Sequence, residues 1–139
     1  MFGKAAEEAA SDYRLWGNLA DAQRFDPAAD DAGRASYRKA IDLAKLQLDV
    51  KPNDADTLTN IAWYYANLGD LDAARSSLNR AQALSPTDAQ QQYMAALVYV
   101  LLNETDNARR AIDSAVSTGF PQAILEATPE LENTLLINN

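Results

Sequence analysis

The side chains that could carry out chemistry in this sequence are carboxylates. They occur in the pairs Glu7-Glu8, Asp30-Asp31 and Asp54/Asp56, and paired carboxylates can act as general acid and base or bind calcium. The residue pattern of a calcium-binding loop is absent. The two aspartate pairs stand at expected loops and helix starts, where acidic groups cap a helix, and Glu7-Glu8 lies on a solvated helical face. We therefore interpret these carboxylates as capping or solvated groups, with catalysis as the alternative.

Composition excludes other catalytic arrangements. The 139 residues include no histidine and no cysteine, so a serine nucleophile has no histidine base, and disulfides and thiolate metal sites cannot form. The five glycines are dispersed, which excludes a glycine-rich phosphate-binding loop. We predict that the chain is not an enzyme and that it holds no cofactor and no metal.

Charge and hydropathy narrow the class of partner. The net charge is −8 and the sequence pI is about 4.4, whereas nucleic-acid binding rests on neutralising phosphates with lysine and arginine. The longest apolar run, residues 93–102, is about half the length needed to cross a bilayer. Glutamates near the N-terminus interrupt any signal-peptide core. We expect no nucleic-acid partner, no membrane insertion and a cytoplasmic location.

The elements that must position any binding residues are helices, and the segment 54–86 shows them most clearly. Leu58, Ile61, Ala62 and Tyr65 recur at helical spacing and so share one face of a first helix. Leu-Gly-Asp at 68–70 breaks the pattern. A second apolar stripe follows and stops before a proline; its residues are Ala74, Leu78 and Ala81. The pattern predicts a helical hairpin.

This order of large, small and aromatic residues, with the Leu-Gly-Asp turn and the closing proline, resembles the tetratricopeptide repeat, a helix-turn-helix unit of about 34 residues. The resemblance implies an all-α fold, a right-handed superhelix of antiparallel hairpins in which neighbouring units bury each other's apolar faces. Small residues let the paired helices approach, and larger ones fill the space between hairpins.

The same spacing recurs on both sides of this segment. Downstream, the packing residues are Ala95, Ala96 and Tyr99 and then Ala108, Ile112 and Ala115; upstream, they are Trp16, Leu19, Ala20 and Gln23 and then Ala40 and Ala44. The upstream unit is about eight residues longer than the usual period, and we place the insertion in a loop at 25–34. Gln23 replaces an aromatic residue, which indicates looser packing or a contact from that loop. The predicted units are 12–52, 53–86 and 87–120, within one domain spanning 1–139.

The two ends of the chain are expected to differ. Residues 1–11, with Phe2, Ala5 and Ala6, fit the second helix of a preceding unit. They are either the remnant of a longer array or an N-terminal cap, and an open apolar edge here predicts a homo-oligomer. Residues 121–139 are expected to form a capping segment with two short helices, in which Thr128 caps the second. The expected covering residues are Ile124, Leu125, Leu131, Leu135 and Leu136.

In a stack of such hairpins the first helices line the concave surface, so residues offset from the packing stripe are the candidates for binding a peptide. These predicted peptide-binding residues are Arg14, Asn18, Asp21, Arg24, Phe25, Thr59, Asn60, Trp63, Asn67, Tyr93 and Leu97. Aromatic side chains dominate binding hot spots, and asparagine amides can hydrogen-bond a peptide backbone. The alternative for Trp63 and Tyr93 is packing within the array, and Asn18 and Asn60 can equally tie neighbouring helices together.

The sequence therefore predicts a protein-interaction module that binds a peptide or partner domain, with self-association through exposed repeat ends as the alternative. Phrases at 12–22 and 37–44, together with the Gly-Phe-Pro to Pro-Glu-Leu tail at 119–131, resemble the C-terminal tetratricopeptide segments of bacterial signalling proteins. In that group the repeats follow a kinase, cyclase or winged-helix domain. The resemblance implies a scaffold or regulatory role. Family members that hold the C-terminal carboxylate of chaperone tails use lysines on this surface, and this chain has Gly17 and Thr59 where a lysine is needed. The sequence therefore does not favour a chaperone tail as the ligand.

Overall fold

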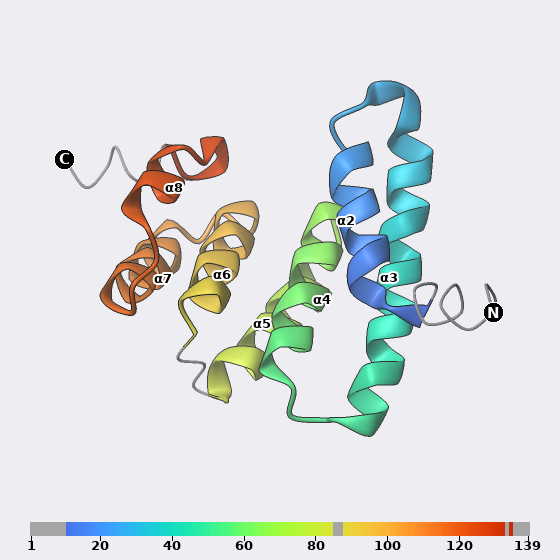
Figure 1. Cartoon of the computed structure of the whole chain (residues 1–139), viewed down its shortest axis with the longest axis horizontal. Coiled ribbons are helices and arrows are strands. Elements are labelled where there is room, and N and C mark those ends of the chain that lie inside the picture. Colours follow the sequence, from blue (N-terminus) through green and yellow to red (C-terminus); the bar gives the residue numbers. More distant parts are fainter. Residues whose placement is uncertain (1–10, 85–87, 133, 135–139) are drawn as a thin grey trace, which may run out of the picture.

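The computed structural model describes residues 11–84, 88–132 and 134, and within them the fold is all-α. Three antiparallel hairpins follow one another along the long axis of the molecule (Figure 1). The first pairs α2 (Tyr13–Gln23) with α3 (Asp30–Val50). The second pairs α4 (Ala55–Asn67) with α5 (Leu71–Ala83), and the third pairs α6 (Ala89–Leu101) with α7 (Thr105–Ser117). This arrangement is a helical repeat of the tetratricopeptide type.

Aspartate side chains begin four of these helices. Asp12, Asp54, Asp70 and Asp88 precede α2, α4, α5 and α6, and each accepts a hydrogen bond from a backbone N–H in the first turn. Such caps satisfy backbone donors that have no partner within the helix. The capping interpretation of Asp54 therefore agrees with the structure.

The turn after each of α4, α6 and α7 contains one residue with a left-handed backbone. These residues are Gly69, Asn103 and Gly119, with φ of 83°, 60° and 102°. In each turn the next backbone N–H closes the helix end, as when Asp70 donates to the Tyr65 carbonyl over 3.0 Å. Glycine and asparagine adopt this conformation most readily, so each of these positions favours the end of a helix.

The first hairpin is built differently, because its insertion is mostly helical. The predicted loop at 25–34 contains the short 3-10 helix η1 (Pro27–Ala29), and α3 already begins at Asp30. Asp26 caps η1, and Asp30 and Asp31 provide acidic groups in the first turn of α3, where they complement the helix dipole. The extra residues therefore lengthen α3. Ser36 of this helix donates a 2.8 Å hydrogen bond to Oε1 of Gln23.

The buried faces agree with the predicted stripes in the second and third hairpins. Ala74, Leu78 and Ala81 of α5 are buried, as are the corresponding residues of α7, Ala108, Ile112 and Ala115. In α2 the prediction holds for Ala20 and is wrong for Leu19. The buried residues there are Tyr13, Gly17 and Ala20, Leu19 is 44% exposed, and Trp16 is partly buried.

Gly17 explains why this face of α2 is buried. A Cβ at position 17 would collide with the hydroxyl of Tyr64 and would lie 2.6 Å from ring atom Cε1. The missing side chain lets α2 seat the Tyr64 ring, which also contacts the rings of Tyr13 and Tyr37. Gly17 is thus a packing position between the first two hairpins, and it does not face a ligand.

We expect Gly17→Ala to lower the free energy of unfolding by about 1–3 kcal/mol because of overpacking. In a helix, alanine is more favourable than glycine by up to about 1 kcal/mol when nothing obstructs its side chain. A net loss of stability would therefore be due to the collision with Tyr64. Urea denaturation measures it. In a Tyr64→Ala background, which removes the hydroxyl and the ring atoms that the added Cβ would meet, the loss should shrink; an equal loss in both backgrounds would contradict the assignment.

A C-terminal segment, residues 120–131, covers the third hairpin. It contains α8 (Gln122–Glu126) and the 3-10 helix η2 (Pro129–Leu131), and η2 packs on α6. Leu125 and Leu131 are buried as expected, but Ile124 is 46% exposed. The Thr128 side chain does not cap η2. Leu135 and Leu136 lie outside the described residues, as do Phe2, Ala5 and Ala6.

Candidate functional site

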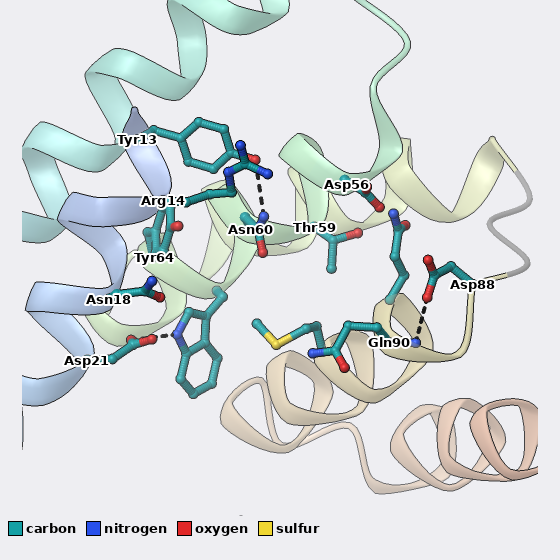
Figure 2. A pocket seen from close by; sticks show the side chains of 13 residues that line it. Tyr13, Arg14, Asn18, Asp21, Asp56, Thr59, Asn60, Tyr64, Asp88 and Gln90 are labelled. Atoms are coloured by element: carbon teal, nitrogen blue, oxygen red, sulfur yellow. Dashed lines mark hydrogen bonds between the residues drawn. The ribbon is translucent and has the colours of Figure 1, made fainter. Parts of the chain in front are cut away.

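The first helices of the three hairpins enclose a groove between them. It has a volume of about 360 Å³ and is open to solvent along one side. Figure 2 shows α2 side chains on one wall, α4 side chains at the base and residues from the start of α6 on the other wall. We call this the α2–α4–α6 groove, and its lining residues are Tyr13, Arg14, Asn18, Asp21, Asp56, Thr59, Asn60, Trp63, Tyr64, Asp88, Gln90, Gln91 and Met94.

The groove brings together part of the predicted peptide-binding set. The members that line it are Arg14, Asn18, Asp21, Thr59, Asn60 and Trp63. The members that lie outside it are Arg24, Phe25, Asn67, Tyr93 and Leu97. Arg24, Phe25 and Asn67 lie at or beyond the C-terminal ends of α2 and α4, whereas Tyr93 and Leu97 are packed against other parts of the chain.

Arg24, the first residue after α2, connects α2 to α4 and to η2. Its guanidinium donates to Oδ1 of Asn67 over 3.0 Å and forms an ion pair with Oε1 of Glu130, also over 3.0 Å. It also lies over the rings of Phe25 and Trp63, at 4.3 and 4.9 Å from their centroids. Phe25 remains 72% exposed. Arg24 and Asn67 are thus engaged in linking α2, α4 and η2.

Tyr93 packs against the C-terminal segment, and Leu97 belongs to the buried core. The Tyr93 ring stacks on Phe120 with 4.5 Å between centroids, and its hydroxyl is 3.0 Å from Oγ1 of Thr128. Thr128 in turn donates to the Ile124 carbonyl over 2.7 Å. Leu97 is buried. The two predicted anchors of the third hairpin are therefore packing residues in this structure, which is the alternative foreseen for Tyr93.

Trp63 is held by Asp21. The indole Nε1 donates to Oδ1 of Asp21 over 2.9 Å, and only 4% of Trp63 is exposed. The Tyr37 hydroxyl donates to the same oxygen over 2.7 Å. Burial, followed by this hydrogen bond, raises the pKa of Tyr37 well above its usual range. Asp21 is therefore the shared acceptor for one aromatic donor from α3 and one from α4.

A hydrogen-bond chain crosses from α4 to α2 and back. Asn60 Nδ2 donates to the Tyr13 hydroxyl over 3.1 Å, and that hydroxyl lies 3.1 Å from Oγ1 of Thr57. Thr57 completes the chain by donating to Oδ2 of Asp54 over 2.9 Å. The amide nitrogen of Asn60 thus ties α4 to α2, which is the structural role that the sequence offered as the alternative to peptide binding. The amide oxygen of Asn60, Oδ1, accepts no hydrogen bond from a described residue.

Several lining residues were missed by sequence reasoning. They are Tyr13, Tyr64, Asp88, Gln91 and Met94, and the predicted peptide-binding set also omits Asp56 and Gln90. The repeat period could have identified Met94, because it stands 34 residues after Asn60. Tyr13 and Tyr64 carried no such signal, since their position depends on the missing side chain at Gly17.

The groove is acidic at one end. Its charged residues are Arg14 and three aspartates, Asp21, Asp56 and Asp88. Arg14 pairs with Asp12 over 3.3 Å at the edge of the groove. Burial raises the pKa of Asp56, and the nearby carboxylates of Asp54 and Asp88 raise it further, while Arg14 lowers it. The start of α4 therefore faces a region where negative charge is incompletely balanced.

Nothing in the described part of the chain points to a metal centre or a membrane span. Over residues 11–84, 88–132 and 134, no three carboxylates gather closely enough to hold a metal ion. In the same ranges no helix combines the length and the apolar character needed to cross a bilayer.

Stacked antiparallel hairpins with a groove along their first helices define a helical-repeat protein of the kind that presents an extended binding surface. The tetratricopeptide repeat family model matches residues 55–88, which contain α4 and α5. Repeats of this family generally mediate protein–protein interaction and are not catalytic. Comparisons with curated proteins and with solved structures gave no match.

Proposed function

We propose that the chain is a protein-interaction module that binds an extended peptide segment of a partner protein in the α2–α4–α6 groove. The observation that carries the proposal is the open groove itself, because it retains hydrogen-bonding groups that the fold does not use. Among the described residues, the Asn18 amide, the Asn60 Oδ1 and the Gln90 side chain have no hydrogen-bond partner. Such groups can pair with a peptide backbone.

The best test residues are those that line the groove without supporting the fold. Trp63 is unsuitable, because its indole is buried and bonded to Asp21, so loss of binding on its removal would be confounded with loss of structure. Asn18 is exposed and lines the groove. A larger side chain there would occupy the space expected for the ligand.

We expect Asn18→Tyr to weaken peptide binding about tenfold or more, since it fills the groove. The probe is a library of fluorescein-labelled octapeptides, screened against the purified chain and followed by anisotropy titration of the strongest binder. Asn79→Tyr is the matched control, because Asn79 is an exposed residue of α5 outside the groove. Equal affinity of both variants and the native chain would place the binding surface elsewhere.

We also propose, on the resemblance of residues 12–22, 37–44 and 119–131 to bacterial signalling proteins, that this module recruits partners for a larger signalling protein. The coding sequence around these residues tests this directly: an adjoining kinase, cyclase or winged-helix domain supports it, and an unrelated context refutes it. Self-association through the N-terminal edge stays a prediction, because residues 1–10 lie outside the described residues.

A further inference from the structure

Three hydrogen-bond acceptors gather at the acidic end of the groove. Asp56 is the second residue of α4, Asp88 caps α6, and Gln91 lies in the first turn of α6. Figure 2 shows the carboxylates of Asp56 and Asp88 directed into the space between the two helix starts. One oxygen of Asp88 accepts the Gln90 backbone N–H over 2.7 Å. Asp56 makes no hydrogen bond or ion pair with any other described residue.

Gln91 supplies an independent observation. Its side chain lines the groove and is 9% exposed, and its Oε1 is buried without a hydrogen-bond partner among the described residues. A buried polar atom left without a partner costs about 1–3 kcal/mol, so nearly all such atoms in native proteins are paired. The missing partner of Gln91 must be a donor.

The surrounding charges specify which donor fits. The charged groups facing Asp56 are Asp54 on its own helix, Asp88 from α6 and Arg14 from α2, and the two carboxylates raise the pKa of Asp56 while the guanidinium lowers it. The Arg14 guanidinium is already paired with Asp12. No described lysine or arginine forms an ion pair with Asp56 or Asp88. A positive charge would therefore relieve repulsion here.

We propose that this end of the groove, formed by Asp56, Asp88 and Gln91, is a subsite for the cationic side chain of a lysine or arginine in the bound peptide. The subsite rests on the proposed function of the groove and specifies the partner as a protein segment with a basic residue. An ammonium or guanidinium group carries several N–H donors, so it can serve the buried amide oxygen and the two carboxylates together. Arginine has the additional advantage of a planar fork of donors.

The test starts from the octapeptide library screened against the native full chain. We expect lysine or arginine to be enriched at one position of the binding peptides. In the strongest arginine-containing binder, replacing that arginine by citrulline, which keeps the shape and removes the charge, should weaken binding about tenfold or more. Raising the salt concentration should weaken the arginine peptide more than the citrulline peptide, because salt screens charge pairs.

Two variants connect the preference to the subsite. Asp56→Asn should reduce the affinity for the arginine peptide several-fold and reduce the arginine-to-citrulline ratio, because it removes a charge that pairs with arginine alone. Gln91→Leu should weaken both peptides, because citrulline also has N–H donors for the Gln91 oxygen. The control is Asp72→Asn, because Asp72 is likewise the second residue of its helix but lies on α5 away from the groove. Circular dichroism and urea denaturation establish that each variant is folded. Gln91→Leu should not be less stable than the native chain, because it removes the unpaired oxygen.

The outcomes separate the two proposals. If peptides bind and Asn18→Tyr weakens them, but no basic residue is enriched or Asp56→Asn leaves the citrulline ratio unchanged, the subsite is refuted and the groove proposal stands. If no library peptide binds the native chain, both proposals fail. Enrichment of a basic residue, a lower arginine-to-citrulline ratio in Asp56→Asn but not in Asp72→Asn, and weaker binding of both peptides by Gln91→Leu support the subsite.

Discussion

Leu131→Ala should lower the free energy of unfolding by about 2–5 kcal/mol, the range for removing a fully buried leucine side chain. Leu131 ends η2, has no exposed surface and belongs to the main core, where η2 packs on α6. Its loss should therefore release the C-terminal segment from the third hairpin. Urea denaturation measures the stability, and amide hydrogen exchange should show lost protection in residues 122–131 first.

Ile124→Ala is the matched control for this prediction. Ile124 is in the same segment but is 46% exposed, so its truncation should change stability by less than about 1 kcal/mol. Equal losses for the two variants would mean that burial of Leu131 against α6 does not hold the segment in place.

Asp21→Ala should lower the free energy of unfolding by about 3 kcal/mol, because hydrogen bonds to a charged acceptor contribute more than neutral ones and two donors lose the same acceptor. Those donors are the Tyr37 hydroxyl and the Trp63 indole, both on buried side chains. Trp63 fluorescence should also change on this substitution. Thermal and urea denaturation give the stability change.

Asp21→Asn removes the negative charge of residue 21 but keeps an oxygen that can accept hydrogen bonds. The asparagine Oδ1 can still accept from both donors, so this variant should lose less than half as much stability as Asp21→Ala. If Asp21→Asn were as unstable as Asp21→Ala, the charge of Asp21, and not its position as an acceptor, would be the stabilising property.

The parts of the fold that were predictable depend on local patterns. Leu-Gly-Asp at 68–70 and Gly119 mark turns where a left-handed residue ends a helix, and the alanines of α5 and α7 recur at helical spacing on their buried faces. These features are properties of one hairpin and its neighbour. The match of the tetratricopeptide repeat model to residues 55–88 falls on the segment where they are most complete.

The errors arose where a distant side chain decides the packing. Leu19 has the spacing of a core residue, yet α2 instead presents Gly17 to Tyr64, which is 47 residues later. The insertion at 25–34 contains turn-forming residues, yet Asp30 and Asp31 start α3 early and leave a short connection. Neither outcome can be read from periodicity within the first unit.

The candidate groove was predictable in its location but not in its extent. Three of the residues predicted from the first helices, Asn18, Thr59 and Asn60, line one cavity in the structure. Tyr93 is the equivalent of Thr59 on α6, but its ring and hydroxyl contact the C-terminal segment. Sequence spacing identifies which face of a helix is available, whereas the path of a tail over that face depends on the tertiary structure.

The ion pair between Arg24 and Glu130 joins residues that are 106 positions apart in the chain. Arrays of repeats ordinarily make contacts between neighbours alone, so that they can fray from either end one unit at a time. Here the end of the first hairpin is fastened to the segment that follows the last one, and Arg24 also holds Asn67 of the middle hairpin. Separating the first hairpin from the C-terminal segment must therefore break this ion pair as well as the contacts between neighbouring hairpins.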